Sequence, residues 1–209
     1  MAGAKVESER INERRIGKSD ILWQGSDGTP AIWLMSGTSA TFAGAAGSFN
    51  PGPSWQIKGT GDFDGDGKSD ILWQGSDGTP AIWLMNGTTA TFAGAAGSFN
   101  PGPSWQIKGT GDFNGDGKSD ILWQGSDGTP AIWFMDGINA VSVGAVGPFN
   151  PAPSWQVKGA GDFNGDGKSD ILWQGSDGTP AIWLMDGTNF VSANAAGSSN
   201  PGHDWHIMA

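Results

Sequence analysis

The stretch GDFDGDGKSD, residues 61–70, places four aspartates in a short loop rich in glycine. Carboxylates at alternate positions can converge on one point, because glycine lets the backbone curl tightly. Calcium prefers six to eight oxygen ligands, supplied by carboxylates, amide oxygens, backbone carbonyls and water. The loop is therefore a candidate calcium site. Whether the ion would do chemistry or hold the chain in shape depends on the surrounding elements.

Three loops share this arrangement of oxygen donors. Each offers side chains at loop positions 1, 3, 5 and 9 and a lysine backbone carbonyl at position 7. The predicted ligands are Asp62, Asp64, Asp66, Lys68 and Asp70; then Asp112, Asn114, Asp116, Lys118 and Asp120; then Asp162, Asn164, Asp166, Lys168 and Asp170. Asparagine at position 3 keeps an oxygen and removes a charge, which suits a metal ligand and not a general acid.

Other interpretations of the loops fit less well. Solvated hairpin turns are also rich in Asp and Gly, but carboxylates packed this closely in three loops would repel strongly without a cation. An EF-hand needs a bidentate Glu at position 12, where Trp73, Trp123 and Trp173 stand. Magnesium seldom takes an all-protein cage. We therefore predict structural Ca²⁺, about three ions per chain.

The loops recur because the chain repeats every fifty residues. The sequence KSDILWQGSDGTPAIW occurs four times, starting at Lys18, Lys68, Lys118 and Lys168. Turn sequences divide the second unit into four predicted strands, at residues 55–63, 69–74, 80–85 and 89–96. No stretch with helical periodicity lies between these turns, so we predict an all-β protein.

The middle strands of each unit carry apolar residues on both sides of the pleat, as where Ile71 and Trp73 oppose Leu72. Such strands must be covered on both faces, and a two-sheet sandwich would leave one face wet. Four-stranded antiparallel units stacked face to face provide that cover, which indicates a β-propeller with four blades of fifty residues. Trp73, Trp83 and their repeats are expected in the core between blades.

The ends of the chain bear on how the blades close. We predict a charged tail or remnant at residues 1–16 and the propeller at 17–209, with blade units starting near 18, 55, 105 and 155. Residues 203–209 align with a first strand and are expected to complete the first blade. Since four blades is the low limit for a propeller, we favour a homodimer whose chains exchange closing strands in an eight-bladed ring over a four-bladed monomer.

The first unit lacks the acidic loop. Asn12, Arg14 and Ile16 stand at its ligand positions, and only Asp20 remains. We predict no calcium there. Two explanations stay open: residues 1–16 are a remnant, or the arginine-rich stretch seals a junction between chains.

Composition excludes several classes of function. The net charge of -10 disfavours nucleic acid, and the absence of cysteine excludes disulfides and zinc-thiolate sites. No apolar stretch is long enough for membrane insertion, and no signal peptide is recognised, so localisation stays unknown. The two histidines, His203 and His206, have no ordered serine beside them. We expect no catalytic site and no enzyme.

A further tryptophan series follows the polar NPGPS-type loops and offers a different chemistry. Indole rings beside polar loops can stack on sugar faces. Because successive strands run in opposite directions, this series is expected on the face opposite the calcium loops. The candidate carbohydrate-binding residues are Trp55, Trp105, Trp155 and Trp205.

The motifs GDFNGDGKSDILW and AIWLMNG resemble those of the FG-GAP or VCBS repeat, found in integrin-type propellers and bacterial relatives, and the resemblance runs from about Gly17 onward. It implies structural calcium at the three acidic loops. Some members resemble fungal lectins that bind sugars between blades, and others are secreted or cell-surface adhesion modules. They usually have seven blades, whereas this chain has four repeats. We expect a non-catalytic glycan-binding module; the alternative is a self-assembling structural fragment with no ligand beyond calcium.

Overall fold

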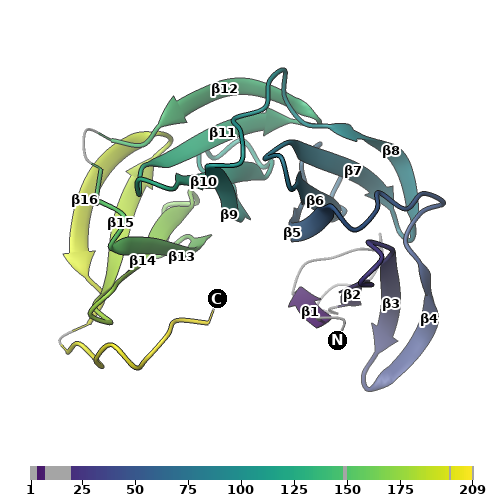
Figure 1. Cartoon of the computed structure of the whole chain (residues 1–209), viewed down its shortest axis with the longest axis horizontal. Helices are drawn as coiled ribbons and strands as arrows, with labels where there is room; N and C mark the ends of the chain where they lie inside the picture. Colours follow the sequence, from purple (N-terminus) through teal and green to yellow (C-terminus); the bar gives the residue numbers. More distant parts are fainter. Residues whose placement is uncertain (1–3, 8–19, 148–149, 198, 209) are drawn as a thin grey trace. The chain divides into compact units, whose positions relative to one another are not determined.

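The computed structural model describes residues 4–7, 20–147, 150–197 and 199–208, which form strands and no helix (Figure 1). The strands build four antiparallel sheets of four strands, one sheet for each repeat. The all-β prediction with four four-stranded repeats is therefore confirmed.

The sheets share one order, in which each strand pairs with its neighbours in the chain. The first sheet contains β1 (Ala4–Glu7), β2 (Asp20–Gln24), β3 (Pro30–Ser36) and β4 (Ser39–Ala45). The second contains β5 (Trp55–Gly61), β6 (Asp70–Gly75), β7 (Pro80–Asn86) and β8 (Thr89–Ala95). The third contains β9 (Trp105–Gly111), β10 (Asp120–Gly125), β11 (Pro130–Asp136) and β12 (Asn139–Ala145). The fourth contains β13 (Trp155–Gly161), β14 (Asp170–Gly175), β15 (Pro180–Asp186) and β16 (Asn189–Ala195).

The GSDG turn fixes the hairpin between the second and third strands of each sheet. In the second repeat, Gly78 adopts φ 94°, which only glycine reaches without strain. The Asp77 carboxylate accepts hydrogen bonds from the Thr79 backbone N–H (3.0 Å) and hydroxyl (2.9 Å), and these bonds lower its pKa. The same bonds recur in the other three repeats. These aspartates therefore shape turns.

The second strands of the second to fourth sheets are buried on both faces, as the apolar pattern predicts, whereas β2 of the first sheet is only partly buried. Every residue of β6 and of β10 is buried, whereas the outer strands β8 and β12 are mostly exposed. Trp73, Trp123 and Trp173 are completely buried. Each packs on the tryptophan of the third strand, with ring centroids 4.9–5.1 Å apart. In these three repeats both predicted core series therefore lie in the interior, but the expectation is wrong for Trp33 in the first repeat, which is 39% exposed.

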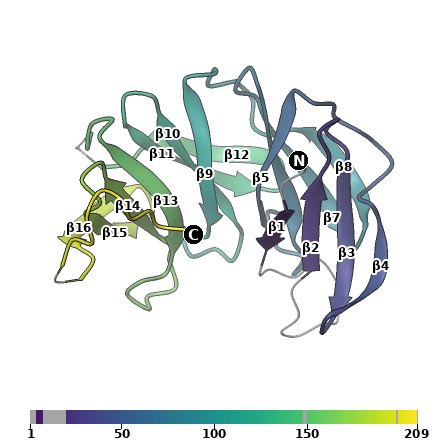
Figure 2. The ribbon, with the colours of Figure 1, turned by 60° about the horizontal axis from the view of Figure 1, so that its bottom comes forward.

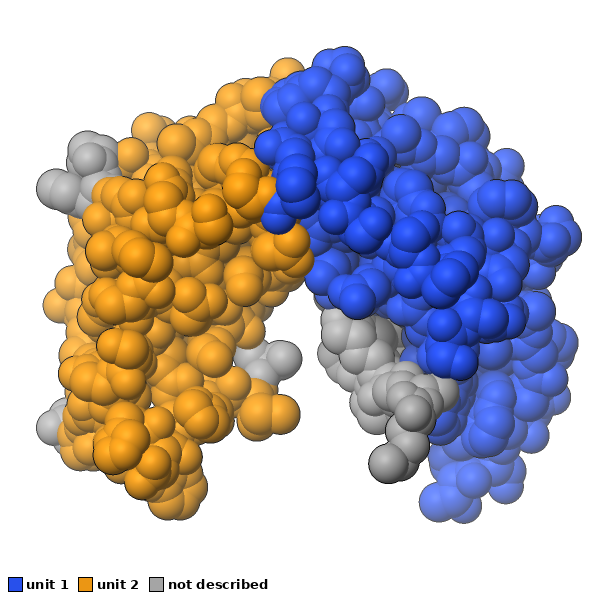
Figure 3. Space-filling view, in the orientation of Figure 1, with its two compact units in different colours: residues 1–103, 137–139 blue, residues 104–136, 140–209 orange. Residues whose placement is uncertain are grey.

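The chain divides into two compact units, residues 1–103 with 137–139 and residues 104–136 with 140–209 (Figure 3). The core of the first unit joins Leu22 and Ile32 of the first sheet to Ile71, Trp73 and other buried residues of the second. The core of the second unit joins the third and fourth sheets in the same way. Within each unit, two sheets thus cover each other's apolar faces.

The first sheet differs from the prediction at its edge. β1 pairs with β2 in the register Ala4↔Trp23 to Glu7↔Asp20 (Figure 2). Residues 203–208 form no strand and β1 lies at the edge of the first sheet, so within this chain the C-terminal segment does not close that sheet. Residues 4–7 reach β2 across a much shorter connection, and the entropy cost of closing a loop grows with its length. Asn12, Arg14 and Ile16 lie outside the described residues.

Candidate metal centre

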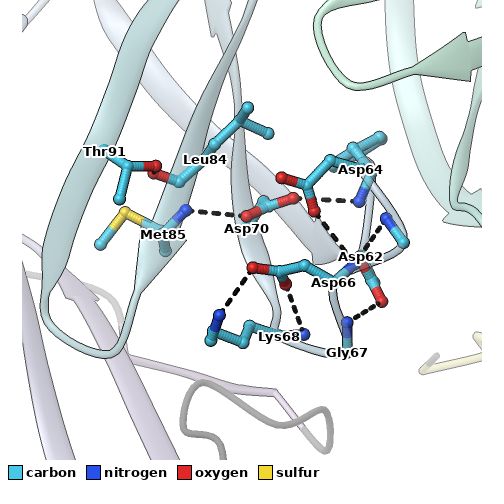
Figure 4. A network of polar contacts seen from close by, with 11 residues as sticks. Asp62, Asp64, Asp66, Gly67, Lys68, Asp70, Leu84, Met85 and Thr91 are labelled. Atoms are coloured by element: carbon cyan, nitrogen blue, oxygen red, sulfur yellow. Dashed lines mark hydrogen bonds and ion pairs between the residues drawn. The ribbon is translucent and has the colours of Figure 1, made fainter.

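Each acidic loop joins the first two strands of a sheet, as between β5 and β6 (Figure 4). Gly65 and Gly67 have φ values of 76° and 82° and so turn the backbone around the side chain of Asp62. One Asp62 oxygen accepts the N–H groups of Gly65 (2.7 Å) and Asp66 (3.1 Å), and the other accepts that of Gly67 (2.8 Å). Asp62 therefore organises the loop that carries the other donors.

Asp112 and Asp162 make the same three bonds in the later loops. In the fourth repeat, the N–H groups of Gly167, Gly165 and Asp166 lower the pKa of Asp162. A carboxylate oxygen has further lone pairs after accepting such bonds. The local geometry is therefore shared by all three loops and leaves capacity for a cation.

The aspartate at loop position 9 is buried and tied to two elements. Asp70 accepts the N–H of Phe63 in the loop (3.0 Å) and of Met85 on β7 (2.8 Å). Burial raises its pKa to about 7, and the charges of Asp64 and Asp62 add to that shift. Asp120 has equivalent bonds and a pKa raised to about 7 by burial. A nearby cation would favour the ionised form of both groups.

Three carboxylates converge in the second repeat. Oxygens of Asp62, Asp64 and Asp70 lie within 4.8 Å of one another. Burial raises the pKa of Asp64, and its neighbours Asp66 and Asp62 raise it further. Hard oxygen donors at this density fit calcium, which would also relieve the repulsion. The residues present therefore suit the predicted ion. Asp66 instead points to Lys68, with Nζ to Oδ2 at 2.7 Å.

The third and fourth loops place asparagine at position 3. The side-chain amides of Asn114 and Asn164 donate to Asp116 (3.0 Å) and Asp166 (2.9 Å). Their amide oxygens accept the backbone N–H of the same aspartates. Each loop thus keeps an oxygen at this position and loses one negative charge.

The lysine at position 7 takes a different partner in these loops. Lys118 binds Asp136 (2.6 Å) and Lys168 binds Asp186, both at the end of the sheet's third strand. Asn86 occupies the equivalent place in the second repeat, so no carboxylate draws Lys68 out of its loop. The partner of each lysine thus depends on a residue eighteen positions later, on the third strand, and the sequence analysis did not predict it.

The loops also touch the repeat that follows them. The carbonyl oxygen of Phe63 accepts the N–H of Gly137, and that of Phe113 accepts the N–H of Gly187. Phe63 and Phe113 are completely buried, whereas Phe163 in the fourth repeat is 48% exposed. An ordered loop therefore helps to join successive repeats, which favours a structural role for any bound ion.

Three of the four candidate sugar-binding tryptophans, Trp55, Trp105 and Trp155, start the first strands β5, β9 and β13, whereas Trp205 lies in a segment that forms no strand. Trp55, Trp105 and Trp155 are half-buried, and their rings pack over Gly75, Gly125 and Gly175 on the paired strand. Trp205 is 67% exposed. The structure therefore leaves part of each ring in contact with solvent.

Trp55 lines an apolar pocket of about 340 Å³ within the first unit. Its other walls are Phe49, Pro51, Trp73, Ala81, Trp83, Ala93, Gly94 and Ala95. The volume lies in the range of small-ligand sites. The pocket offers aromatic surface and no charged side chain.

One of the two histidines has a carboxylate beside it. His203 lies 3.1 Å from Asp204, and both side chains are exposed to solvent. Among the described residues, no helix is long and apolar enough to cross a membrane.

A glutamine on the second strand, which the sequence analysis did not single out, holds the next first strand in place; it is half-buried as Gln24 and buried as Gln124 and Gln174. Gln24 donates to the Trp55 carbonyl (2.6 Å) and accepts the N–H of Ile57 (3.0 Å). Gln124 and Gln174 make the same pair of bonds to residues 155 and 157 and to residues 205 and 207. The sequence WQG, present in every repeat, could have predicted this role. A polar side chain on an otherwise apolar strand needs hydrogen-bond partners.

Comparison with known protein families also identifies a repeat in this chain. A family model described as an FG-GAP-like repeat matches residues 16–73 and 62–123. The two matches together run from residue 16 to residue 123, more than half of the 209-residue chain. No curated protein matches the chain.

Proposed function

The chain belongs to the FG-GAP-like repeat family, and we propose that it is a non-catalytic, calcium-stabilised binding module whose ligand is a glycan. Calcium would occupy the three acidic loops and hold each against the first two strands of its sheet, and in the second and third repeats also against the repeat that follows. The observation that carries this part is the convergence of Asp62, Asp64 and Asp70 on one point. β-Propeller-like repeats of this family are typically non-catalytic, and calcium ligands must stay ionised, so these aspartates are poor general acids.

The glycan part of the proposal rests on the tryptophans at the first-strand starts. A ring that packs on glycine with one face keeps its other surface for a ligand, and sugar rings present apolar faces that stack on indole. Trp55 adds the apolar pocket beside it.

A glycan array probed with the calcium-loaded chain tests this part. We expect binding that weakens at least about tenfold when Trp55, Trp105 and Trp155 are changed to Ala, a loss of about 1.4 kcal/mol. Phe42→Ala, which removes an exposed aromatic ring from the outer strand β4, is the matched control and should bind normally. An array without any bound glycan would refute the glycan part and leave the calcium part standing.

A second candidate function is self-assembly into a homodimer or a larger ring. Gln174 holds Trp205 and Ile207 as Gln24 holds the first strand of the second sheet. Yet residues 203–208 pair with no strand in the described part of the chain. Such a segment can pair with another copy.

Light scattering at several concentrations tests self-assembly. The 209-residue chain is expected to form dimers, and Ile207→Pro should yield monomers, because proline removes the N–H that Gln174 accepts. A strictly monomeric wild-type chain would refute this candidate.

A further inference from the structure

The first strands of the third and fourth sheets each contain a one-residue bulge. Ile107 pairs with Trp123 and Gly109 with Leu122, which leaves Lys108 without a partner residue on β10. In the same way, the pairing of Val157 and Gly159 skips Lys158 on β13. Bulges break the alternation of a strand and re-aim the side chain that they carry. On both β9 and β13, the residue at the bulge is therefore a lysine.

The two bulges lie next to each other within the second unit. β9 and β13 run side by side (Figure 2). A Cβ atom on Gly109 would lie 3.9 Å from the Cα atom of Gly159 and 3.8 Å from the backbone nitrogen of Ala160. A glycine follows each lysine, so the backbones can approach this closely. The close approach places two ammonium-bearing side chains in one neighbourhood.

Among the described residues, no carboxylate pairs with the two lysines at this position. Lys108 and Lys158 are half-buried, and neither forms an ion pair with a described carboxylate, whereas Lys68, Lys118 and Lys168 all do. Burial lowers the pKa of Lys108, and the positive charge of Lys158 lowers it further. Two uncompensated lysines are unusual in a chain with a net charge of -10.

We propose that Lys108 and Lys158 form a binding site for a tetrahedral oxyanion, phosphate or sulfate, either free or as part of a larger ligand. Each ammonium group supplies three donors and a compact positive charge, a combination that binds phosphate-type oxygens well. The anion would replace the missing counter-charge and relieve the repulsion between the lysines. The site is separate from the acidic loops and needs neither calcium nor a glycan.

Calorimetric titration of the chelator-treated full chain with potassium phosphate and potassium sulfate tests the proposal. Potassium chloride at matched ionic strength serves as the blank. We expect both oxyanions to bind, and the Kd to weaken at least about tenfold in Lys108→Gln/Lys158→Gln. Lys108→Arg/Lys158→Arg keeps both charges and should retain binding. Val141→Glu/Val191→Glu makes the same change in net charge at two exposed positions and should bind like wild type.

Three results would overturn the proposal. They are no heat beyond the chloride blank, equal oxyanion affinity in the glutamine variant, and equal loss in the Val141→Glu/Val191→Glu control, which would indicate a general charge effect. Tryptophan fluorescence of each variant checks folding. If the glutamine variant folds and binds phosphate and sulfate as the wild type does, the two lysines contribute only to packing.

Discussion

The acidic loop of the second repeat and those of the third and fourth repeats reach the same charge in different ways. Each neighbourhood holds four carboxylates and one lysine. In the second repeat, all four carboxylates are in the loop and Lys68 binds Asp66 there. In the others, asparagine replaces one loop carboxylate, and the fourth stands on the third strand as Asp136 or Asp186 and draws the lysine away.

This comparison separates the loop features that all three repeats share from the features that differ between them. The shared parts are the position 1 aspartate that shapes the loop and the buried position 9 aspartate that ties it to two elements. The variable parts are the side chain at position 3 and the partner of the lysine. We infer that calcium affinity depends on the pair of variable positions together, and stability on the shared ones.

The largest expected effect comes from the shared buried aspartate. Asp70→Ala leaves the N–H groups of Phe63 and Met85 without an acceptor, and Asp120→Ala does the same to Phe113 and Met135. Each substitution should lower the free energy of unfolding by about 2–4 kcal/mol in calcium-free buffer. Urea unfolding measures it. A loss below about 1 kcal/mol in either repeat would break the claim that these residues are structural without metal.

The strands and loops could be predicted from sequence because repetition supplies the same local signals four times. Strands expected at 55–63, 69–74, 80–85 and 89–96 are found at 55–61, 70–75, 80–86 and 89–95. The two N–H partners of Asp70 could not be predicted, since Met85 comes from the next hairpin. The partner of each lysine likewise depends on position 86, 136 or 186. The lysine bulges arise from strand register, which local patterns do not specify.

An intermediate effect is expected when the variable positions are exchanged. Asp64→Asn alone should weaken calcium binding at the second loop about tenfold, because one ligand charge is lost. Asn86→Asp should draw Lys68 away from Asp66, as Asp136 draws Lys118. The double variant should therefore return to within about threefold of wild-type affinity, a coupling that a double-mutant cycle measures. Strictly additive effects would contradict the charge exchange.

The smallest effect concerns the lysine itself. Lys68→Gln removes a nearly buried positive charge that touches a loop carboxylate, so calcium affinity at that loop should rise several-fold, by about 1 kcal/mol. Lys118→Gln should change affinity less, because its ammonium group is held at Asp136. The backbone carbonyls stay in both variants. Equal responses in calorimetric titration would remove the distinction between the two kinds of loop.

Calcium titration of the chelator-treated chain, followed by calorimetry and thermal melting, tests the central claim most directly. We predict three ions per chain, one per acidic loop, and a higher melting temperature. At free calcium of about 100 times Kd, each site should add about 2.7 kcal/mol. Asp62→Asn/Asp112→Asn/Asp162→Asn should abolish most of the binding. No bound calcium, together with identical melting in calcium and in chelator, would contradict the account.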